Sequence, residues 1–279
     1  MGKLKDTLKR GAHYVFEGVP VHKVEVNVAQ INYGGILKGK RVLITGGSRG
    51  LGFAIAKKAL KEQAMVCITG RSLENLEQAK EKLGRSPNLF IIENDIREIS
   101  KHDNVIKEAC NKMGGIDILV NNAGVSVHDI TYLTCTESQW DMQVDTNLKG
   151  TYFMTQAFMK YYEKSGLSNG KIIIMASERG LYGDDVPYGL VKRALISYTE
   201  GLAVRLINKG VRVNAIAPGV TATDMTGYSP DGDLYRKYAR GKRILLPEEI
   251  AETAVFLMSD ASNCISGQVI ACNEANHLK

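Results

Sequence analysis

A tyrosine and a lysine four positions apart, Tyr188 and Lys192, are the pair in this chain best suited to proton transfer. On a helix, positions i and i+4 share one face, so the hydroxyl and the ammonium can point at one substrate. A free phenol has a pKa near 10, and a neighbouring ammonium lowers that pKa toward neutrality by favouring the phenolate. The same spacing also occurs on ordinary exposed helices. Its place after an apolar run that ends at Ser177 favours acid–base chemistry.

A glycine-rich turn forms the second candidate site, at Thr45-Gly46-Gly47-Ser48-Arg49-Gly50-Leu51-Gly52. It joins a predicted strand, Arg41–Thr45, to a predicted helix, Phe53–Lys61. A turn of this kind at the positive end of a helix lets phosphate groups approach backbone N–H donors. The alternative is a tight turn used only for close packing. The strand before and the helix after it favour a nucleotide site.

The elements that position these residues follow a strand–helix alternation along the chain. Nearly continuous apolar runs predict strands buried on both faces, as in a parallel sheet covered by helices. Together they predict an α/β fold, a Rossmann-type doubly wound sheet of seven parallel strands. The predicted strands are Arg41–Thr45, Met65–Thr69, Leu89–Glu93, Asp117–Asn121, Lys171–Ala176, Val211–Ala217 and Gln268–Cys272, and the clearest helices between them are Leu73–Leu83, Ser100–Lys112 and Ala194–Asn208.

The domain organisation expected is a single catalytic domain over residues 38–279, preceded by an N-terminal extension over residues 1–37. In the extension, Leu4, Leu8 and Ala12 can share a helix face, and residues 24–28 alternate like a half-buried strand. An arm that packs on its own or a neighbouring subunit is the favoured interpretation. Attachment of a basic amphipathic helix to a membrane surface is the alternative.

Several motifs in order resemble those of the short-chain dehydrogenase/reductase family, from about Lys38 to Cys272. They are the TGxxxGxG turn, Asn121-Asn122-Ala123-Gly124 after the fourth strand, Asn147, Ser177, the YxxxK pair and Pro218-Gly219-Val220-Thr221-Ala222-Thr223. The resemblance implies that Tyr188 is the acid/base and that Lys192 tunes it and holds the nicotinamide ribose. It also implies that Ser177 polarises the substrate oxygen and that Asn147 serves a proton relay through a water.

The cofactor implied is NADP(H). Family members that prefer NAD usually carry Asp where this chain has Gly70, and Arg71 and Arg49 can meet a 2′-phosphate. A surface Arg71 that only caps the next helix is the alternative. The cofactor-binding residues expected are Gly46, Ser48, Arg49, Gly50, Leu51, Gly52, Arg71, Ser72, Asp95, Ile96, Asn122, Ala123, Gly124, Tyr188, Lys192, Pro218, Gly219, Val220 and Thr223.

The activity expected is NADP(H)-dependent interconversion of a carbonyl and a secondary alcohol, with a 3-oxoacyl thioester or another polar keto compound as substrate. Charges between Ser177 and Tyr188 favour a polar substrate. The chain departs from the family's frequent acidic–Gly–Gly ending at Asn273-Glu274-Ala275. Five basic residues are expected on a solvated helix face rather than as a carrier site: Arg236, Lys237, Arg240, Lys242 and Arg243. The rival functions are a sugar-nucleotide epimerase or dehydratase and a non-catalytic NADP-binding interaction protein.

Composition limits the classes of partner and the cellular location that we expect for this chain. The 279 residues carry a net charge of +6 that is spread along the chain, which argues against a nucleic-acid partner. The five cysteines form no CxxC pair, so we expect reduced thiols, a cytoplasmic location and no metal site. No apolar run is long enough for a membrane span. A homotetramer or homodimer is expected through helices at Trp140–Lys164 and Pro187–Asn208, with Phe153, Phe158, Leu195 and Leu202 available for burial.

Overall fold

Seven parallel strands form the sheet at the centre of the computed structural model, which describes residues 33–278. Their spatial order is β3-β2-β1-β4-β5-β6-β7, as predicted for a Rossmann-type sheet. Chain order reverses beside β1, so the crevice above the carboxyl ends of β1 and β4 is where such sheets hold ligands. The bounds are β1 (Arg41–Ile44), β2 (Met65–Gly70), β3 (Leu89–Glu93), β4 (Ile118–Asn121), β5 (Gly170–Met175), β6 (Val211–Pro218) and β7 (Val269–Cys272).

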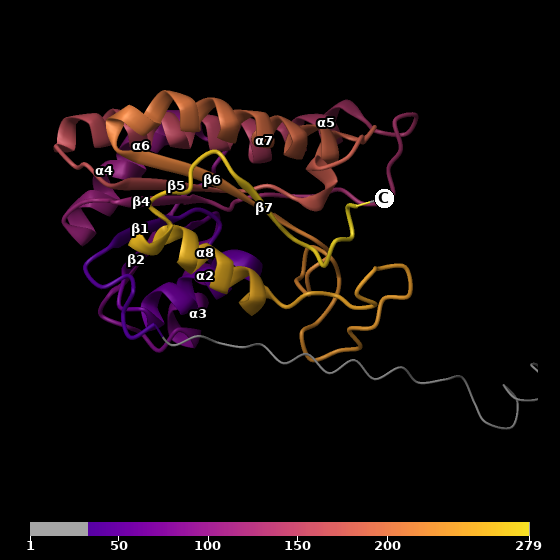
Figure 1. The fold of residues 1–279 in the computed structure, drawn as a ribbon, viewed down its shortest axis with the longest axis horizontal. Coiled ribbons are helices and arrows are strands. Elements are labelled where there is room, and N and C mark those ends of the chain that lie inside the picture. The colour runs from indigo at the N-terminus through magenta and orange to yellow at the C-terminus, as the bar shows by residue number, and fades with distance from the viewer. Residues whose placement is uncertain (1–32, 279) are drawn as a thin grey trace, which may run out of the picture.

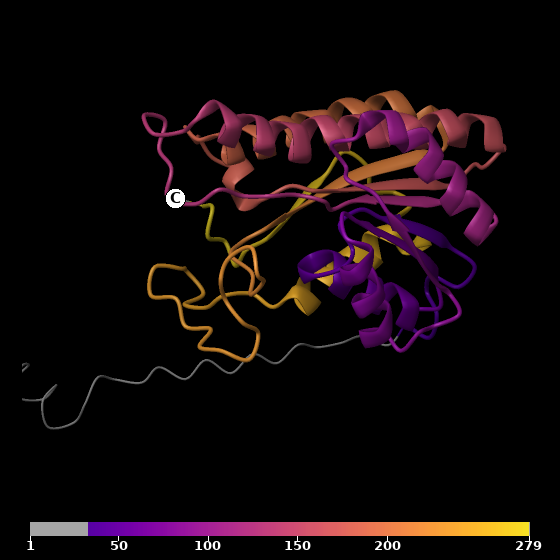
Figure 2. The ribbon, with the colours of Figure 1, turned by 180° about the vertical axis from the view of Figure 1, so that it is seen from behind.

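Helices cover both faces of the sheet (Figures 1 and 2). One layer holds α2 (Gly50–Lys61), α3 (Leu73–Lys82) and α8 (Pro247–Met258). The opposite layer holds α4 (His102–Met113), α5 (Glu137–Gln143), α6 (Gly150–Ser165) and α7 (Pro187–Leu206). Short 3-10 turns lie at Ile99–Lys101, Glu178–Gly180, Ile207–Lys209 and Asp260–Ser262, and a π-helical turn spans Val144–Lys149. Among residues 33–278, every helix is too short or too polar to span a membrane.

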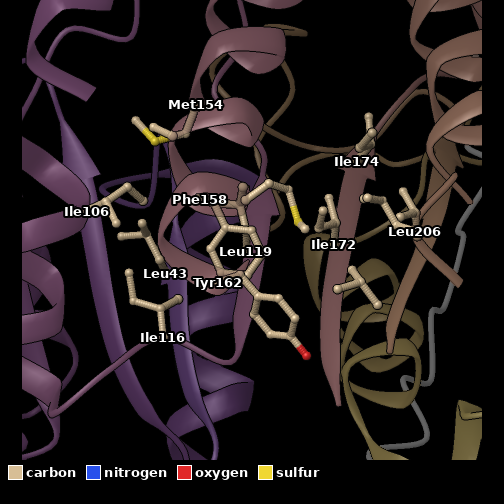
Figure 3. Packing of buried hydrophobic residues seen from close by; sticks show 14 of the residues in the cluster. Leu43, Ile106, Ile116, Leu119, Met154, Phe158, Tyr162, Ile172, Ile174 and Leu206 are labelled. Atoms are coloured by element: carbon tan, nitrogen blue, oxygen red, sulfur yellow. The ribbon is translucent and has the colours of Figure 1, made fainter. Parts of the chain in front are cut away.

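The core divides into two layers because side chains alternate across each strand. In β1, Val42 and Ile44 pack with α2 and α8, whereas Leu43 packs with α4 and α6. Figure 3 shows the second layer, with Leu43, Met154 and Phe158 packed together. Phe158 and Leu195 are at most 1% exposed, so the expectation that these two are available for an interface is wrong. Periodicity marked them as apolar but did not distinguish the core side of their helices from the outer side.

Some helix boundaries differ from the prediction. The helix after the glycine turn begins at Gly50 rather than Phe53, whereas α7 begins at Pro187, as in the longer predicted range Pro187–Asn208 and not in the shorter range that starts at Ala194. Proline is favoured in the first helical turn because its missing N–H would have no partner there. The helix expected over Trp140–Lys164 is interrupted by the π-helical turn, which contains Asn147.

The segment 219–246, between β6 and α8, contains no helix. The solvated helix face expected for its basic residues is therefore wrong. Arg243 in particular is only 17% exposed at its side chain and pairs with Glu249 at 2.7 Å and with Glu274 at 2.6 Å. Charge spacing could not reveal this, because both carboxylates come from outside the segment.

The start of the described chain is fixed to the α2–α8 layer by a buried carboxylate. Glu62 is fully buried and accepts hydrogen bonds from the backbone N–H groups of Tyr33, Gly35 and Ile36. Burial opposes its ionisation, but Lys58 and these donors lower its pKa. Residues 33–37 thus dock against the sheet domain. The helix and strand expected within residues 1–32 lie outside the described residues.

Candidate active site

The glycine turn and the end of β4 are tied together at the crevice. Asn122 donates from Nδ2 to the carbonyl oxygens of Thr45 and Gly46, each at 2.9 Å. The Thr45 hydroxyl accepts from the backbone N–H groups of Asn122 and Ala123 at 3.0 Å. These bonds tie the glycine turn after β1 to the chain that follows β4.

Within the turn, the glycines do two different jobs. Gly46 and Gly50 have φ of +66° and +56°, a left-handed backbone that favours glycine. A Cβ on Gly52 would lie 2.3 Å from the Gly46 carbonyl oxygen and 2.5 Å from Asn122 Nδ2. Gly52 is therefore required for packing of the helix on the turn. The first N–H groups of α2 remain available as anion donors.

A cavity of about 460 Å³ extends from this turn to Tyr188 and Lys192. Of the residues expected to bind cofactor, fourteen line it: Gly46, Ser48, Arg49, Gly50, Leu51, Arg71, Ser72, Ile96, Asn122, Ala123, Gly124, Tyr188, Lys192 and Thr223. Gly52, Asp95, Pro218, Gly219 and Val220 lie outside the lining. The lining residues that the sequence did not single out as binding residues are Thr69, Gly70, Asn75, Asn94, Val125, Thr146, Met175, Ala176, Asp224 and Met225. Most of these stand next to a predicted residue or end a predicted strand, which is the signal that could have found them.

At one end of the cavity, Gly70 ends β2 and Arg71 follows it, and both line the cavity. The neighbouring carboxylate of Glu93 lies outside the lining and accepts a hydrogen bond from the Leu73 N–H at 3.2 Å. Asp95, one of the expected cofactor-binding residues, pairs with Arg97, with Nη2 and Oδ2 2.6 Å apart. The hydrogen bond from Arg97 lowers the Asp95 pKa. Arg49 lines the cavity while its Nη1 lies 3.4 Å from Asp224 Oδ2. Both of those side chains are exposed, so the pair is weak.

At the other end, β5 and α7 bring Ser177, Tyr188 and Lys192 together. Ser177 hydrogen-bonds to Tyr188, and Lys192 Nζ lies 5.6 Å from the Tyr188 ring centroid. Lys192 also donates to the Met175 carbonyl oxygen at 2.7 Å. Burial lowers the pKa of Lys192 to about 8. Tyr188 and Lys192 thus line one wall of the cavity, and Ser177 is hydrogen-bonded to Tyr188 beside it.

The protonation of Tyr188 differs from the sequence expectation. Burial raises its pKa, while the Ser177 hydrogen bond and the charge of Arg179 oppose that rise. Lys192 is not among the causes, because its own ammonium is destabilised by burial. In this structure Tyr188 is therefore a protonated phenol at neutral pH, suited to donate a proton.

Asn147 lies inside the π-helical turn and is fully buried. Its Oδ1 accepts from the backbone N–H of Val125, and its Nδ2 donates to the Val125 carbonyl oxygen, both at 2.8 Å. A Cβ on Gly124 would lie 2.8 Å from the same Oδ1. The Asn147 side chain therefore fixes the loop after β4.

The loop after β6 contributes to the cavity through its far end. Thr223 and Met225 line it, and the Thr223 methyl group lies 3.5 Å from the place of a Cβ on Gly50. Gly219 instead donates its N–H to the Cys272 carbonyl oxygen at 2.9 Å. Pro218 and Gly219 thus form the base of this loop.

Within residues 33–278, no group of acidic, His or Cys side chains is arranged to hold a metal.

The chain is similar to known proteins along most of its length. A family model described as enoyl-(acyl carrier protein) reductase matches residues 46–274. A 3-oxoacyl-[acyl-carrier-protein] reductase of Chlamydia trachomatis is 34% identical over 249 residues, covering 85% of this chain and 97% of the relative. A 3alpha-hydroxysteroid dehydrogenase of Mediterraneibacter gnavus is 32% identical over 254 residues, covering 86% and 98%.

Solved structures agree in fold. The crystal structure of a putative short-chain alcohol dehydrogenase from Sinorhizobium meliloti has a TM-score of 0.77 and 35% identity, covering 86% of this chain and 97% of that one. A structure of ElxO with NADP bound has a TM-score of 0.78 and 30% identity, covering 86% and 99%.

Proposed function

Because this chain belongs to the short-chain dehydrogenase/reductase family, it is an oxidoreductase that interconverts a carbonyl and a secondary alcohol, and we propose that it does so with NADP(H) as the hydride carrier. The observation that carries the proposal is one cavity that extends from the glycine turn to Tyr188 and Lys192, with Ser177 hydrogen-bonded to Tyr188. One wall can exchange a proton with a substrate oxygen while the turn holds phosphate groups.

The proposed catalytic residues are Asn147, Ser177, Tyr188 and Lys192. Tyr188 gives its phenolic proton to the carbonyl oxygen in reduction and takes it back in oxidation. Ser177, already hydrogen-bonded to Tyr188, polarises the same substrate oxygen. Lys192 holds a cofactor ribose and returns the proton to Tyr188. Since the Asn147 side chain is used by Val125, we assign its place in the relay to the main-chain carbonyl.

NADP(H) fits the far end of the cavity better than NAD(H). Arg71 and Arg49 supply guanidinium groups, and Gly70 leaves the position of a repelling carboxylate empty. The glycine turn and the start of α2 would hold the pyrophosphate. We assign contact with the adenine ring of the cofactor to Ile96 and the backbone next to it. Asp95 can contribute only if its carboxylate is released from Arg97.

A polar keto compound is the proposed substrate class, with a 3-oxoacyl thioester as the specific candidate. The name of the Chlamydia relative supports the thioester. Arg179 supports a polar substrate. Its side chain is 43% exposed, and its charge lowers the pKa of Tyr188.

We also propose a cytoplasmic homotetramer or homodimer, with residues 1–37 as an extension of the catalytic domain. All five cysteines are free thiols, as expected in a reducing compartment. Exposed apolar side chains mark the outer surfaces of α6 and α7, among them Tyr152 at 45% and Val204 at 80%. Such surfaces are candidates for burial between subunits.

Replacing Tyr188 by phenylalanine tests the catalytic assignment. The expected result is a fall in kcat of about 10²–10⁴-fold, because only the proton donor is lost. Binding of NADPH, followed by its fluorescence, should be unchanged because the ring remains. Tyr198→Phe on the same helix is the matched control. Activity of Tyr188→Phe within about tenfold of the wild type would overturn the assignment.

A further inference from the structure

Glu178 is a buried carboxylate directly beside the catalytic serine. It begins the 3-10 turn Glu178–Gly180 and is only 6% exposed. Within residues 33–278 it has no ion-pair partner. Its Oε2 accepts hydrogen bonds from Asn273 Nδ2 at 3.2 Å and from Asn276 Nδ2 at 3.0 Å. Burying a charge costs free energy unless hydrogen bonds compensate it, so these two amides are needed to keep the carboxylate buried here.

The two amides belong to one tight turn that follows β7. The N–H of Asn276 donates to the Asn273 carbonyl oxygen at 2.9 Å, which closes residues 273–276 into a β-turn. Its central residues, Glu274 and Ala275, have φ of +49° and +60°. Turns with two left-handed central residues normally use asparagine and glycine there. Without glycine the turn is unfavourable by itself, so contacts outside it must hold it.

Those contacts come from two sides. On the side of the catalytic loop, Asn273 and Asn276 donate hydrogen bonds to Glu178. On the other side, Glu274 pairs with Arg243 of the segment that follows β6, at 2.6 Å. The C-terminal turn thus joins the catalytic loop to the segment 219–246.

The base of the loop after β6 closes the same cluster. A Cβ on Gly219 would lie 2.9 Å from Asn273 Cβ and 3.3 Å from Glu178 Oε2. The Glu178 carboxylate therefore sits where the serine loop, the Pro218-Gly219 turn and the C-terminal turn meet.

We propose that Glu178 is a positioning residue that fastens the C-terminal turn to the catalytic loop and so sets the place of Ser177 in the active site. The inference rests on the proposed function for its kinetic consequence, but the mechanical link between residues 177–181 and 273–278 does not depend on the reaction. Sequence spacing gave no sign of it, since Glu178 and Asn276 are 98 residues apart.

The carboxylate has a second effect, on the proton donor. Four side chains act on Tyr188: Ser177 through a hydrogen bond, Glu178 and Arg179 through their charges, and Lys192 from above the ring. Of these, Glu178 is the one that raises the Tyr188 pKa. Removing its charge while keeping its acceptor oxygen should move the pH dependence in a known direction, which a purely structural contact would not do.

Amide hydrogen exchange tests the link without any substrate. Asn276→Ala removes one of the two hydrogen bonds that the C-terminal turn donates to Glu178, and it should speed exchange in residues 177–181 by about tenfold. Glu178→Leu, changed on the catalytic side, should do the same in residues 273–278. Asn111→Ala and Glu77→Gln, both exposed elsewhere, are the matched controls. Unchanged exchange in both target segments would overturn the proposal, whatever the enzyme's activity.

Kinetics with Glu178→Gln test the effect on the site. This variant keeps an acceptor oxygen for both asparagines, so we expect residues 273–278 to exchange at the wild-type rate. It also provides a test if Glu178→Leu does not fold. The acid–base limb assigned to Tyr188 in the pH profile of kcat/KM should move to lower pH. An unmoved profile would overturn the effect of the Glu178 charge on Tyr188, whereas the fastening of the two segments is decided by the exchange experiment. Failure of the wild type to oxidise NADPH with any ketone would instead count against the proposed function.

Discussion

At the scale of single residues, cofactor choice depends on the end of β2. Gly70→Asp combined with Arg71→Ala should reverse or flatten a preference for NADPH over NADH, because the carboxylate repels a 2′-phosphate and binds a free hydroxyl. A Cβ on Gly70 would lie 3.3 Å from Leu76 Cδ2, so the new side chain needs only a small shift. The measurement is kcat/KM for both cofactors, with Arg85→Ala outside the cavity as control. A wild type that already prefers NADH would contradict the assignment.

A buried lysine far from the chemistry sets a pH dependence of stability. Lys171 in β5 is 1% exposed and bonds to Ser262 and Asn263, and burial lowers its pKa to about 8. Between that pKa and the ordinary value of 10.5 the unfolded chain binds more protons, so the free energy of unfolding rises with pH.

Denaturant titrations between about pH 8 and 10 should show this rise, to which Lys192 also contributes. Lys171→Met should make the slope shallower, whereas Lys57→Met on an exposed surface should not. Equal slopes for Lys171→Met and the wild type would show that Lys171 is not the source.

At the scale of elements, the joint between the glycine turn and α2 tolerates no side chain at Gly52. The Cβ of Gly52→Ala would overlap the Gly46 carbonyl oxygen and the Asn122 amide, and overpacking of this kind costs about 1–3 kcal/mol. We expect that loss in chemical denaturation together with weakened NADPH binding. Gly183→Ala, whose Cβ meets nothing within 4 Å, is the control. A Gly52→Ala protein as stable as the control would refute the packing role.

The strands were predictable because each is a continuous apolar run, and all seven lie within two residues of the predicted bounds. The motif residues that line the cavity were predictable for a related reason: strand ends and helix starts fix them locally. The ion pair of Asp95 with Arg97 gave no such signal, and Arg97 would compete with a ligand for the same carboxylate. The Glu178 cluster and the course of residues 219–246 depend on contacts between distant segments, which no local pattern encodes.

At the scale of the whole molecule, the exposed apolar side chains of α6 and α7 predict self-association. Light scattering should give the mass of a tetramer or dimer, several times the 30.6 kDa of one chain. Val204→Lys should shift the protein toward monomer because it places a charge on that surface. Leu73→Lys, half-exposed on α3 in the opposite layer, should not. A wild-type monomer at micromolar concentration would refute the assembly.

The tie between Asn122 and the glycine turn also bears on how the protein is made. The donor that holds the Thr45 and Gly46 carbonyls lies 77 and 76 residues further along the chain. During synthesis, β1, β2 and β3 emerge first, with the turn still lacking its brace. Contacts of such long separation form late because the intervening loop must be closed first. A nascent chain therefore gains the shape that binds a dinucleotide only once β4 has left the ribosome and paired with β1.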